Sequence, residues 1–440
     1  MPRNPSPAVL PAPRLGPPPP PRVPVPLRWT LPNGLRVVAA PMHRVPQVVV
    51  RLAIRAGSVF DPPEHPGAAS FVGSLMTEGT ASFSAEALNA RLDLLGAALH
   101  ASVGHDFAEV EGVFLSETLA EGIALLAEVV ARPTFPADET ERVRAESLDA
   151  LVARLDEPAN VAEDRVALET FGAGHPYGLP AFGTEEGIAG VPVETLRRFH
   201  AEHYLPGGSF LIAAGDFDAD ELRGLLADAF AGWTGEARTA VYPPLREVPA
   251  EAGRDVVVPW VDAAQSEIRF GGIGLDRRAP GWVPAAVANY ILGGSTITGR
   301  LGANLREDKG WTYGARSTFT PGLAGGGWIA ETAVDVEVTA DALGEMRAEM
   351  RRMSTEPVPA DELRRAKDAL VLSLPRAFET PARVASRLGT VEAYGLPADY
   401  WETHPARVEA VTAEDVLRVS RVHFDPARLV AVVVGAGAGE

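Results

Sequence analysis

Val191-Pro192-Val193-Glu194 has a counterpart 220 positions further along the chain, Val411-Thr412-Ala413-Glu414. Other residues recur at this spacing, and a second set recurs at a spacing of 223. The first set pairs His203, Tyr204, Pro206 and Gly215 with His423, Phe424, Pro426 and Gly435; the second pairs Pro136, Pro158, Val161, Glu169 and Gly172 with Pro359, Pro381, Val384, Glu392 and Gly395. Because the difference of three falls in one loop, we interpret the chain as two copies of one domain.

Each copy combines strand and helix patterns. Residues 29–39 alternate around Pro32-Asn33-Gly34, which is typical of a β-hairpin. Further strands are expected at 48–54, 97–110 and 210–214, and helices at 88–95, 119–130 and 218–230, the last capped by Asp218 and Glu221. The predicted fold class is α+β. We expect two homologous sandwich domains, each with a mostly antiparallel sheet and helices on one face, forming a clamshell with a ligand cleft.

The composition sets the domain boundaries. Residues 1–26 contain 12 prolines and predict an extended arm. The first domain is expected at 27–235 and the second at 255–440. Between them, residues 236–254 are rich in Pro, Glu and Arg, lack periodicity and predict a linker.

Charge and hydropathy exclude several partners. The chain has 440 residues, a formal net charge of -18 and no cysteine. A nucleic acid or an anionic membrane would need a basic face, so neither is expected as a partner. No apolar run is long enough to span a membrane. The proline-rich start lacks the apolar segment of a secretory signal, which favours the cytoplasm, or the periplasm if a leader is missing.

The segment 293–313 carries candidate functional residues. A glycine-rich loop leads into a helix expected to begin near Thr298, with Leu301 and Leu305 on one face. Gly310 can end this helix, and a strand can start at residues 311–313. Arg306 and Tyr313 then flank the bend, and their donors could hold a peptide carbonyl and the oxyanion formed from it. The alternative is a surface arginine and a core-lining tyrosine.

Two other clusters favour structural roles. Met346, Met350 and Met353 share one helical face, which indicates core packing. His200 and His203 resemble metal ligands in spacing, but only His203 recurs in the second copy, so a structural role is favoured.

Three further motifs carry a resemblance to a known family. They are Leu31-Pro32-Asn33-Gly34-Leu35, the segment from Gly67 to Thr80, and Gly174-His175-Pro176-Tyr177-Gly178. The chain resembles the pitrilysin and insulinase family of inverted zincins, especially bacterial two-domain members similar to mitochondrial processing peptidase. The resemblance covers nearly the whole chain after the proline-rich arm.

The same resemblance indicates that the zinc motif is lost. Catalytic members carry His-x-x-Glu-His, two zinc ligands and a general base, and a third ligand glutamate far downstream. Matching the family pattern places Ser70, Gly73 and Ser74 at the first motif and Ala150 at the third ligand, with Glu146 the nearest acid. Zinc requires imidazole, carboxylate or thiolate ligands, so no metal site is expected in this chain.

The second copy retains the family's substrate-binding pattern. An arginine followed seven residues later by a tyrosine matches Arg306 and Tyr313, and the glycine-rich loop matches Gly293, Gly294, Ser295 and Gly299. The resemblance implies a non-catalytic, substrate-binding subunit of a heterodimeric zinc peptidase. A catalytic homologue bearing His-x-x-Glu-His would be the partner, would carry the zinc, and would cut the peptide substrate. The alternatives are a scaffold protein and a homodimer that captures peptides without cutting them.

Overall fold

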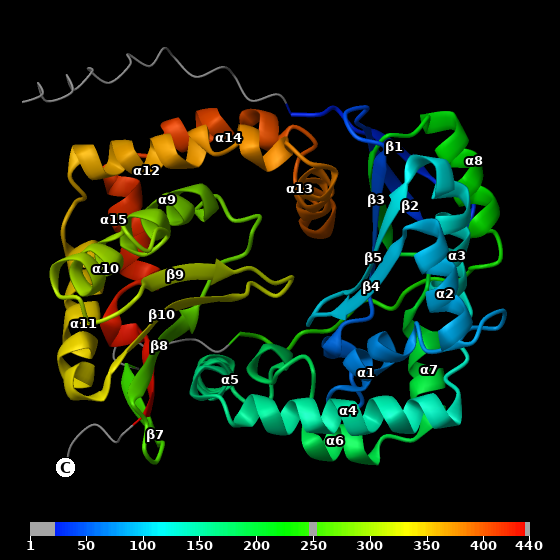
Figure 1. Ribbon diagram of the computed structural model, residues 1–440. Coiled ribbons are helices and arrows are strands. Elements are labelled where there is room, and N and C mark those ends of the chain that lie inside the picture. Colours follow the sequence, from blue (N-terminus) through cyan, green and yellow to red (C-terminus); the bar gives the residue numbers. More distant parts are fainter. Residues whose placement is uncertain (1–22, 246–252, 436–440) are drawn as a thin grey trace, which may run out of the picture.

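The computed structural model describes residues 23–245 and 253–435 and contains two sheets (Figure 1). The first has the order β1-β2-β6-β3-β5-β4, and the second has the order β7-β11-β8-β10-β9. Each sheet has one parallel pair, β2 with β6 and β7 with β11, and is otherwise antiparallel. Parts of the predicted arm (1–22), linker (246–252) and second domain (436–440) lie outside the described residues.

The strands of the first half are β1 (Leu27–Thr30), β2 (Arg36–Pro41), β3 (Gln47–Ile54), β4 (Ala98–Val103), β5 (Ala108–Leu115) and β6 (Phe210–Gly215). Its helices are α1 (Ala68–Leu75), α2 (Ala85–Leu95), α3 (Leu119–Ala131), α4 (Ala137–Leu155), α5 (Pro158–Phe171), α6 (Glu185–Gly190), α7 (Val193–His203) and α8 (Ala219–Ala229).

The strands of the second half are β7 (Arg254–Pro259), β8 (Gln265–Ile273), β9 (Ala315–Thr320), β10 (Gly327–Asp335) and β11 (Val430–Gly435). Its helices are α9 (Trp282–Leu292), α10 (Arg300–Gly302), α11 (Thr339–Thr355), α12 (Ala360–Leu372), α13 (Pro381–Tyr394), α14 (Tyr400–Glu409) and α15 (Ala413–His423). None of the helices within the described ranges is long and apolar enough to cross a membrane.

The sequence repeat is visible in the elements. The pair α7 and β6 returns as α15 and β11 with every boundary shifted by 220 residues, and α5 returns as α13 with a shift of 223. The predicted α+β fold with two homologous halves is therefore confirmed. Each half has its own core between one sheet face and its helices. Met346, Met350 and Met353 are fully buried in the second core, as expected.

The two halves exchange one helix each. The apolar face of α5 packs against the second sheet, where Val166 joins Val430, Val432 and Val434. The helix α13 packs against the first sheet in the same way, as Figure 1 shows. Helices therefore cover both faces of each sheet, one face from the other half, whereas the sequence predicted helices on one face.

Gly271 shows how closely the exchanged helix approaches. A Cβ atom built on this β8 residue would lie 2.4 Å from Cγ2 of Val166 and 2.6 Å from Oγ1 of Thr170. Atoms cannot approach so closely, so any larger residue would push α5 off the sheet. A cavity of about 680 Å³ lies beside this contact and is lined by α5, the second sheet and the first-half residues His105 and Asp106.

Asp106 fastens the first half to the second. Its carboxylate accepts hydrogen bonds from the hydroxyls of Tyr177 (2.8 Å) and Tyr242 (2.6 Å) and from the backbone N–H of Leu323 (3.0 Å). Leu323 belongs to the second half, in the loop between β9 and β10. Tyr242, inside the predicted linker, is therefore held at this junction.

One strand prediction was wrong. Residues 97–110 were expected to form one strand, but they form β4, a turn, and the start of β5. Gly104 and Phe107 close this turn through a backbone hydrogen bond of 2.9 Å. His105 lies in the turn and bonds to the carbonyl oxygen of Leu179, so it does not share a strand with His100.

The two histidines of α7, His200 and His203, contact neighbouring parts of the first half. Nε2 of His200 lies 2.8 Å from the carbonyl oxygen of Val130, and the His203 ring packs against Phe60 and Phe199. These contacts hold α7 against α3 and the first core.

Candidate functional site

Three of the four positions matched to the zinc motif meet in one cavity. Ser70 and Ser74 lie on α1, one helical turn apart, and Ala150 lies on the neighbouring helix α4. All three line a cavity of about 220 Å³, which is completed by Phe71, Ser147, Leu151, Arg154, Phe182 and Ile188. Residues that are far apart in the sequence, on α1 and on α4, therefore lie together in the structure.

The residues of this cavity do not fit a zinc ion. Hydroxyls and a methyl group replace imidazole and carboxylate, and Arg154 brings a positive charge. The Arg154 guanidinium pairs with Asp164 at 2.8 Å and lies 4.5 Å from the centre of the Phe182 ring. Glu146, the nearest acid, pairs with Arg142 at 2.7 Å. Within the described ranges, no group of three His, Cys, Asp or Glu residues could hold a metal.

Gly73 is the position that the family pattern matches to the general base. It is buried, and a Cβ atom there would lie 2.6 Å from Cγ2 of Val103 on β4. The neighbouring strand therefore occupies the space that a glutamate side chain would need.

Asp61 fixes the start of α1. Its carboxylate oxygens accept hydrogen bonds from the backbone N–H groups of Gly67 and Ala69, both at 2.7 Å. Burial raises the pKa of Asp61 to about 7, because desolvation outweighs the two N–H bonds that favour the charged form.

We expect the free energy of unfolding to fall as the pH rises from about 4 to about 7, because folded Asp61 keeps its proton there and the unfolded chain does not. Asp61→Asn is neutral at every pH and should lack this fall. We would measure the free energy of unfolding of both proteins in urea at about pH 5 and about pH 8. From the lower to the higher pH, the value for the variant should rise relative to that of the wild type by at least about 1 kcal/mol. A difference between the two proteins that is independent of pH would contradict this assignment.

The segment around Arg306 differs in detail from the predicted helix and strand. The helix begins at Arg300, after Gly299, and continues from Ala303–Asp308 as a π-helix. Leu301 and Leu305 are both fully buried, as expected. Gly310 ends the helix with a φ of +67°. The strand β9 begins at Ala315 and not at residue 311.

The late start of β9 has a local cause. The hydroxyl of Thr312 donates to the carbonyl oxygen of Gly314 and accepts from the N–H of the same residue. These bonds hold the chain in a turn, and Tyr313 lies at its tip.

A polar network anchors the π-helix to α11. The Asn304 side-chain amide donates to Glu345 (2.9 Å) and Glu349 (3.0 Å), and its oxygen accepts from Lys309 (2.6 Å). Lys309 also pairs with Glu345 at 3.3 Å. The backbone that carries Arg306 is thus fixed, while the Arg306 side chain remains outside the network.

Arg306 and Tyr313 are both available to a ligand. Tyr313 is 95% exposed and has no hydrogen bond within the described ranges, so the alternative of a core-lining tyrosine is wrong. Arg306 is half-exposed, and its one ion pair among the described residues is with its neighbour Glu307, at 3.3 Å. Neither residue lines the cavity of Ser70, Ser74 and Ala150.

The predicted substrate loop divides into buried and exposed residues. Gly293 and Gly299 are buried, and Cβ atoms there would lie 2.6 Å from the Ser317 nitrogen and 2.7 Å from the Ser295 carbonyl oxygen. Gly294 is exposed, and the Ser295 hydroxyl accepts from the N–H of Thr298 at 3.1 Å. The two buried glycines therefore shape the loop, and Gly294 and Ser295 lie nearer its surface.

Sequence analysis missed two residues of this loop. Ile297 is 52% exposed at the loop surface, an apolar side chain among polar neighbours that could have been noticed. Arg300 is buried and pairs with Glu362 of α12 at 2.8 Å, which holds the loop against the second core. No local pattern reveals such a long-range ion pair.

Family profiles match the two halves of the chain in turn. A profile of the insulinase family (peptidase family M16) matches residues 36–185, and one of the peptidase M16 inactive domain matches residues 190–370. An uncharacterized zinc protease of Mycobacterium tuberculosis is 28% identical over 415 residues, which covers 93% of each chain. One from Streptomyces coelicolor is 25% identical over 400 residues, covering 90% of this chain and 86% of the relative.

Solved structures share the fold. A peptidase M16 inactive domain from Pseudomonas fluorescens matches with a TM-score of 0.87 and 26% identity, covering 94% of this chain and 98% of that one. A protease from Helicobacter pylori matches with a TM-score of 0.86 and 18% identity, over 94% of this chain and all of that one.

Proposed function

Because this chain belongs to peptidase family M16, we propose that it is the non-catalytic, substrate-binding subunit of a heterodimeric zinc metallopeptidase. One observation carries the proposal. The cavity at the positions matched to the family's zinc motif is lined by Ser70, Ser74 and Ala150, which cannot ligate zinc. A chain with this cavity needs a second subunit to supply the metal and the general base.

Arg306 and Tyr313 are the residues through which this subunit would act. Tyr313 is exposed and Arg306 is half-exposed, on a backbone segment that Asn304 and Lys309 fix to α11, so their donors can reach a ligand. A guanidinium fork and a phenol can hold a peptide carbonyl and stabilise negative charge that develops on its oxygen. The loop containing Gly294, Ser295 and Ile297 lies just before them in the chain and would contact the peptide.

The partner would be a homologue that bears His-x-x-Glu-His. Two similar clamshells can enclose a chamber of four domains, in which the second half of this chain would face the partner's metal site. The peptide would bind between them. The alternative of a scaffold shares this assembly but assigns no role to Arg306 and Tyr313.

Mixing tests the proposal. The full chain, a catalytic homologue from the same genome, and an equimolar mixture would be compared for cleavage of a fluorogenic peptide pool, with light scattering to follow assembly. We expect a heterodimer, and cleavage only in the mixture. A homologue that is equally active alone, or cleavage by this chain alone, would overturn the proposal.

A further inference from the structure

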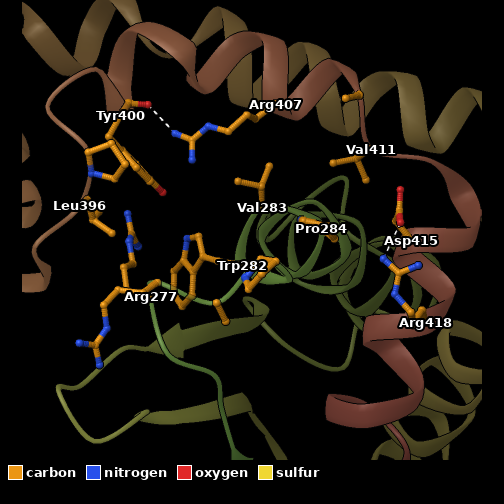
Figure 2. Close-up of a pocket in the computed structure, with 15 residues that line it drawn as sticks. Arg277, Trp282, Val283, Pro284, Leu396, Tyr400, Arg407, Val411, Asp415 and Arg418 are labelled. Atoms are coloured by element: carbon orange, nitrogen blue, oxygen red, sulfur yellow. Dashed lines mark hydrogen bonds and ion pairs between the residues drawn. The ribbon is translucent and has the colours of Figure 1, made fainter.

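A second cavity lies in the other half of the molecule, away from the position of the lost zinc motif. Figure 2 shows it between the start of α9 and the helices α14 and α15. Its volume is about 450 Å³, enough for a small organic molecule. Its lining is unusual because four arginines, Arg277, Arg278, Arg407 and Arg418, stand around an otherwise largely apolar wall.

Two of these arginines have no counter-charge. The guanidinium carbons of Arg277 and Arg407 lie 6.0 and 4.1 Å from the centre of the Tyr400 ring, and Figure 2 shows both extending beside that ring. Neither forms an ion pair within residues 23–245 and 253–435, and Nε of each is buried without a hydrogen-bond acceptor. Arg407 also donates to the backbone carbonyl oxygen of Tyr400.

The carboxylates at this cavity are already engaged. Asp415, which lines the cavity, pairs with Arg418 at its far end, and Asp276, which precedes the lining residues in the chain, pairs with Arg278. The two outer arginines are therefore neutralised, whereas the two inner ones are not. Removing a charge from water without a partner is costly even when the side chain is half-buried, so two such guanidinium groups side by side indicate a candidate ligand site.

Neighbouring groups show the resulting positive field. Arg387 stacks on Trp401, at 5.1 Å, and likewise has no ion pair in the described ranges. Burial lowers the pKa of Arg277 and of Arg387. Burial, together with Arg407, Arg277 and Arg387, lowers the pKa of His404 to about 4. The chain as a whole has a net charge of -18, so the clustering of these positive side chains around one cavity is a feature of this cavity and not of the overall composition.

We propose that this cavity binds a small organic anion. Its carboxylate or phosphate group would lie between Arg277 and Arg407, where planar guanidinium forks bind such groups through paired hydrogen bonds. Its apolar body would lie along Val283, Pro284 and Val411, which line the remaining wall. This site is independent of the proposed role in peptide cleavage.

Calorimetric titration of the full chain tests this site with three probes: inorganic phosphate, phenyl phosphate and benzoate, each against chloride at equal ionic strength. We expect at least one of the two aryl anions to bind, and phenyl phosphate to bind more tightly than phosphate. The comparison of phenyl phosphate with benzoate identifies the preferred head group. Arg277→Met and Arg407→Met should each weaken binding at least about tenfold.

Arg55→Met is the matched control. Arg55 is half-buried, lies 5.8 Å from the centre of the Phe107 ring and has no ion pair within the described ranges, so it resembles Arg277 without lining the cavity. Its loss should leave anion binding unchanged. Absence of binding by all three probes, or unchanged binding in both cavity variants, would overturn the site. Equal affinity for phosphate and phenyl phosphate would overturn the placement of the apolar body.

A second measurement uses the wild-type chain, so its result does not depend on whether the arginine variants fold. Burial is the main cause of the low pKa of His404, and the charges of Arg407 and Arg277 add to it; an anion between these arginines offsets their part, so saturating phenyl phosphate or benzoate should raise the pKa of His404. Imidazole NMR signals followed across the pH range would report the change, with His404→Gln to assign the resonance. An unchanged titration at saturation would also overturn the site.

Discussion

Tyr313→Phe is expected to slow peptide cleavage by the two-subunit complex about a hundredfold, since loss of one donor to a developing oxyanion costs about 3 kcal/mol. The substitution removes only a hydroxyl from a side chain that is 95% exposed and has no hydrogen bond within the described ranges. Melting temperature and heterodimer formation should therefore stay unchanged. Steady-state kinetics of the assembled complex, with light scattering as a check on assembly, measures the effect.

Arg306→Ala should lower turnover and also raise KM, because a guanidinium fork binds the peptide in the ground state as well. Two substitutions in the same half serve as controls. Tyr290→Phe removes a hydroxyl from a half-buried residue of α9, and Arg351→Ala removes an exposed arginine of α11 that has no ion pair in the described ranges. Both should leave cleavage unchanged. If Tyr313→Phe and Arg306→Ala assemble and cleave at the wild-type rate, the chain is a scaffold.

Features that show up as a fixed distance between residues along the chain could be predicted from the sequence. Recurrence of His203 as His423 and of Pro158 as Pro381 revealed the duplication, and the structure repeats the same shifts in α7, α15, α5 and α13. The spacing of Ser70 and Ser74 also places them on one helical face, because side chains one turn apart share a face, whereas only the structure shows that Ala150 of α4 lines the same cavity.

Features that depend on contacts between distant segments were not predictable. The periodicity of α5 indicates an apolar face but does not say which sheet covers it, so the exchange of α5 and α13 was missed. One missed feature is local: the Thr312 side chain bonds to the backbone of Gly314 and so competes with the strand for these groups. The sequence does not distinguish Arg277 and Arg407 from ordinary surface arginines, because the packing of α14 over α9 leaves them half-buried and without an ion pair in the part of the chain that the structure describes.

Introducing zinc ligands at the three positions matched to the family's motif should create a zinc site. Ser70, Ser74 and Ala150 line the same cavity, so the triple variant S70H, S74H and A150E presents two imidazoles and a carboxylate. We expect about one zinc per chain by elemental analysis after dialysis, and none in the wild type. The double variant S70H and S74H, with two ligands, should bind at least about tenfold more weakly in a titration.

Activity should not return with the metal, because the general base is still missing. Adding Gly73→Glu to the triple variant should lower the melting temperature, since a Cβ atom at this position would lie 2.6 Å from Cγ2 of Val103. Val103→Ala removes that methyl group and should recover much of the loss, whereas Val152→Ala, at an exposed position on α4, should not. One zinc retained by the wild type, or no zinc bound by the triple variant, would show that these positions are not the remains of the family's metal site.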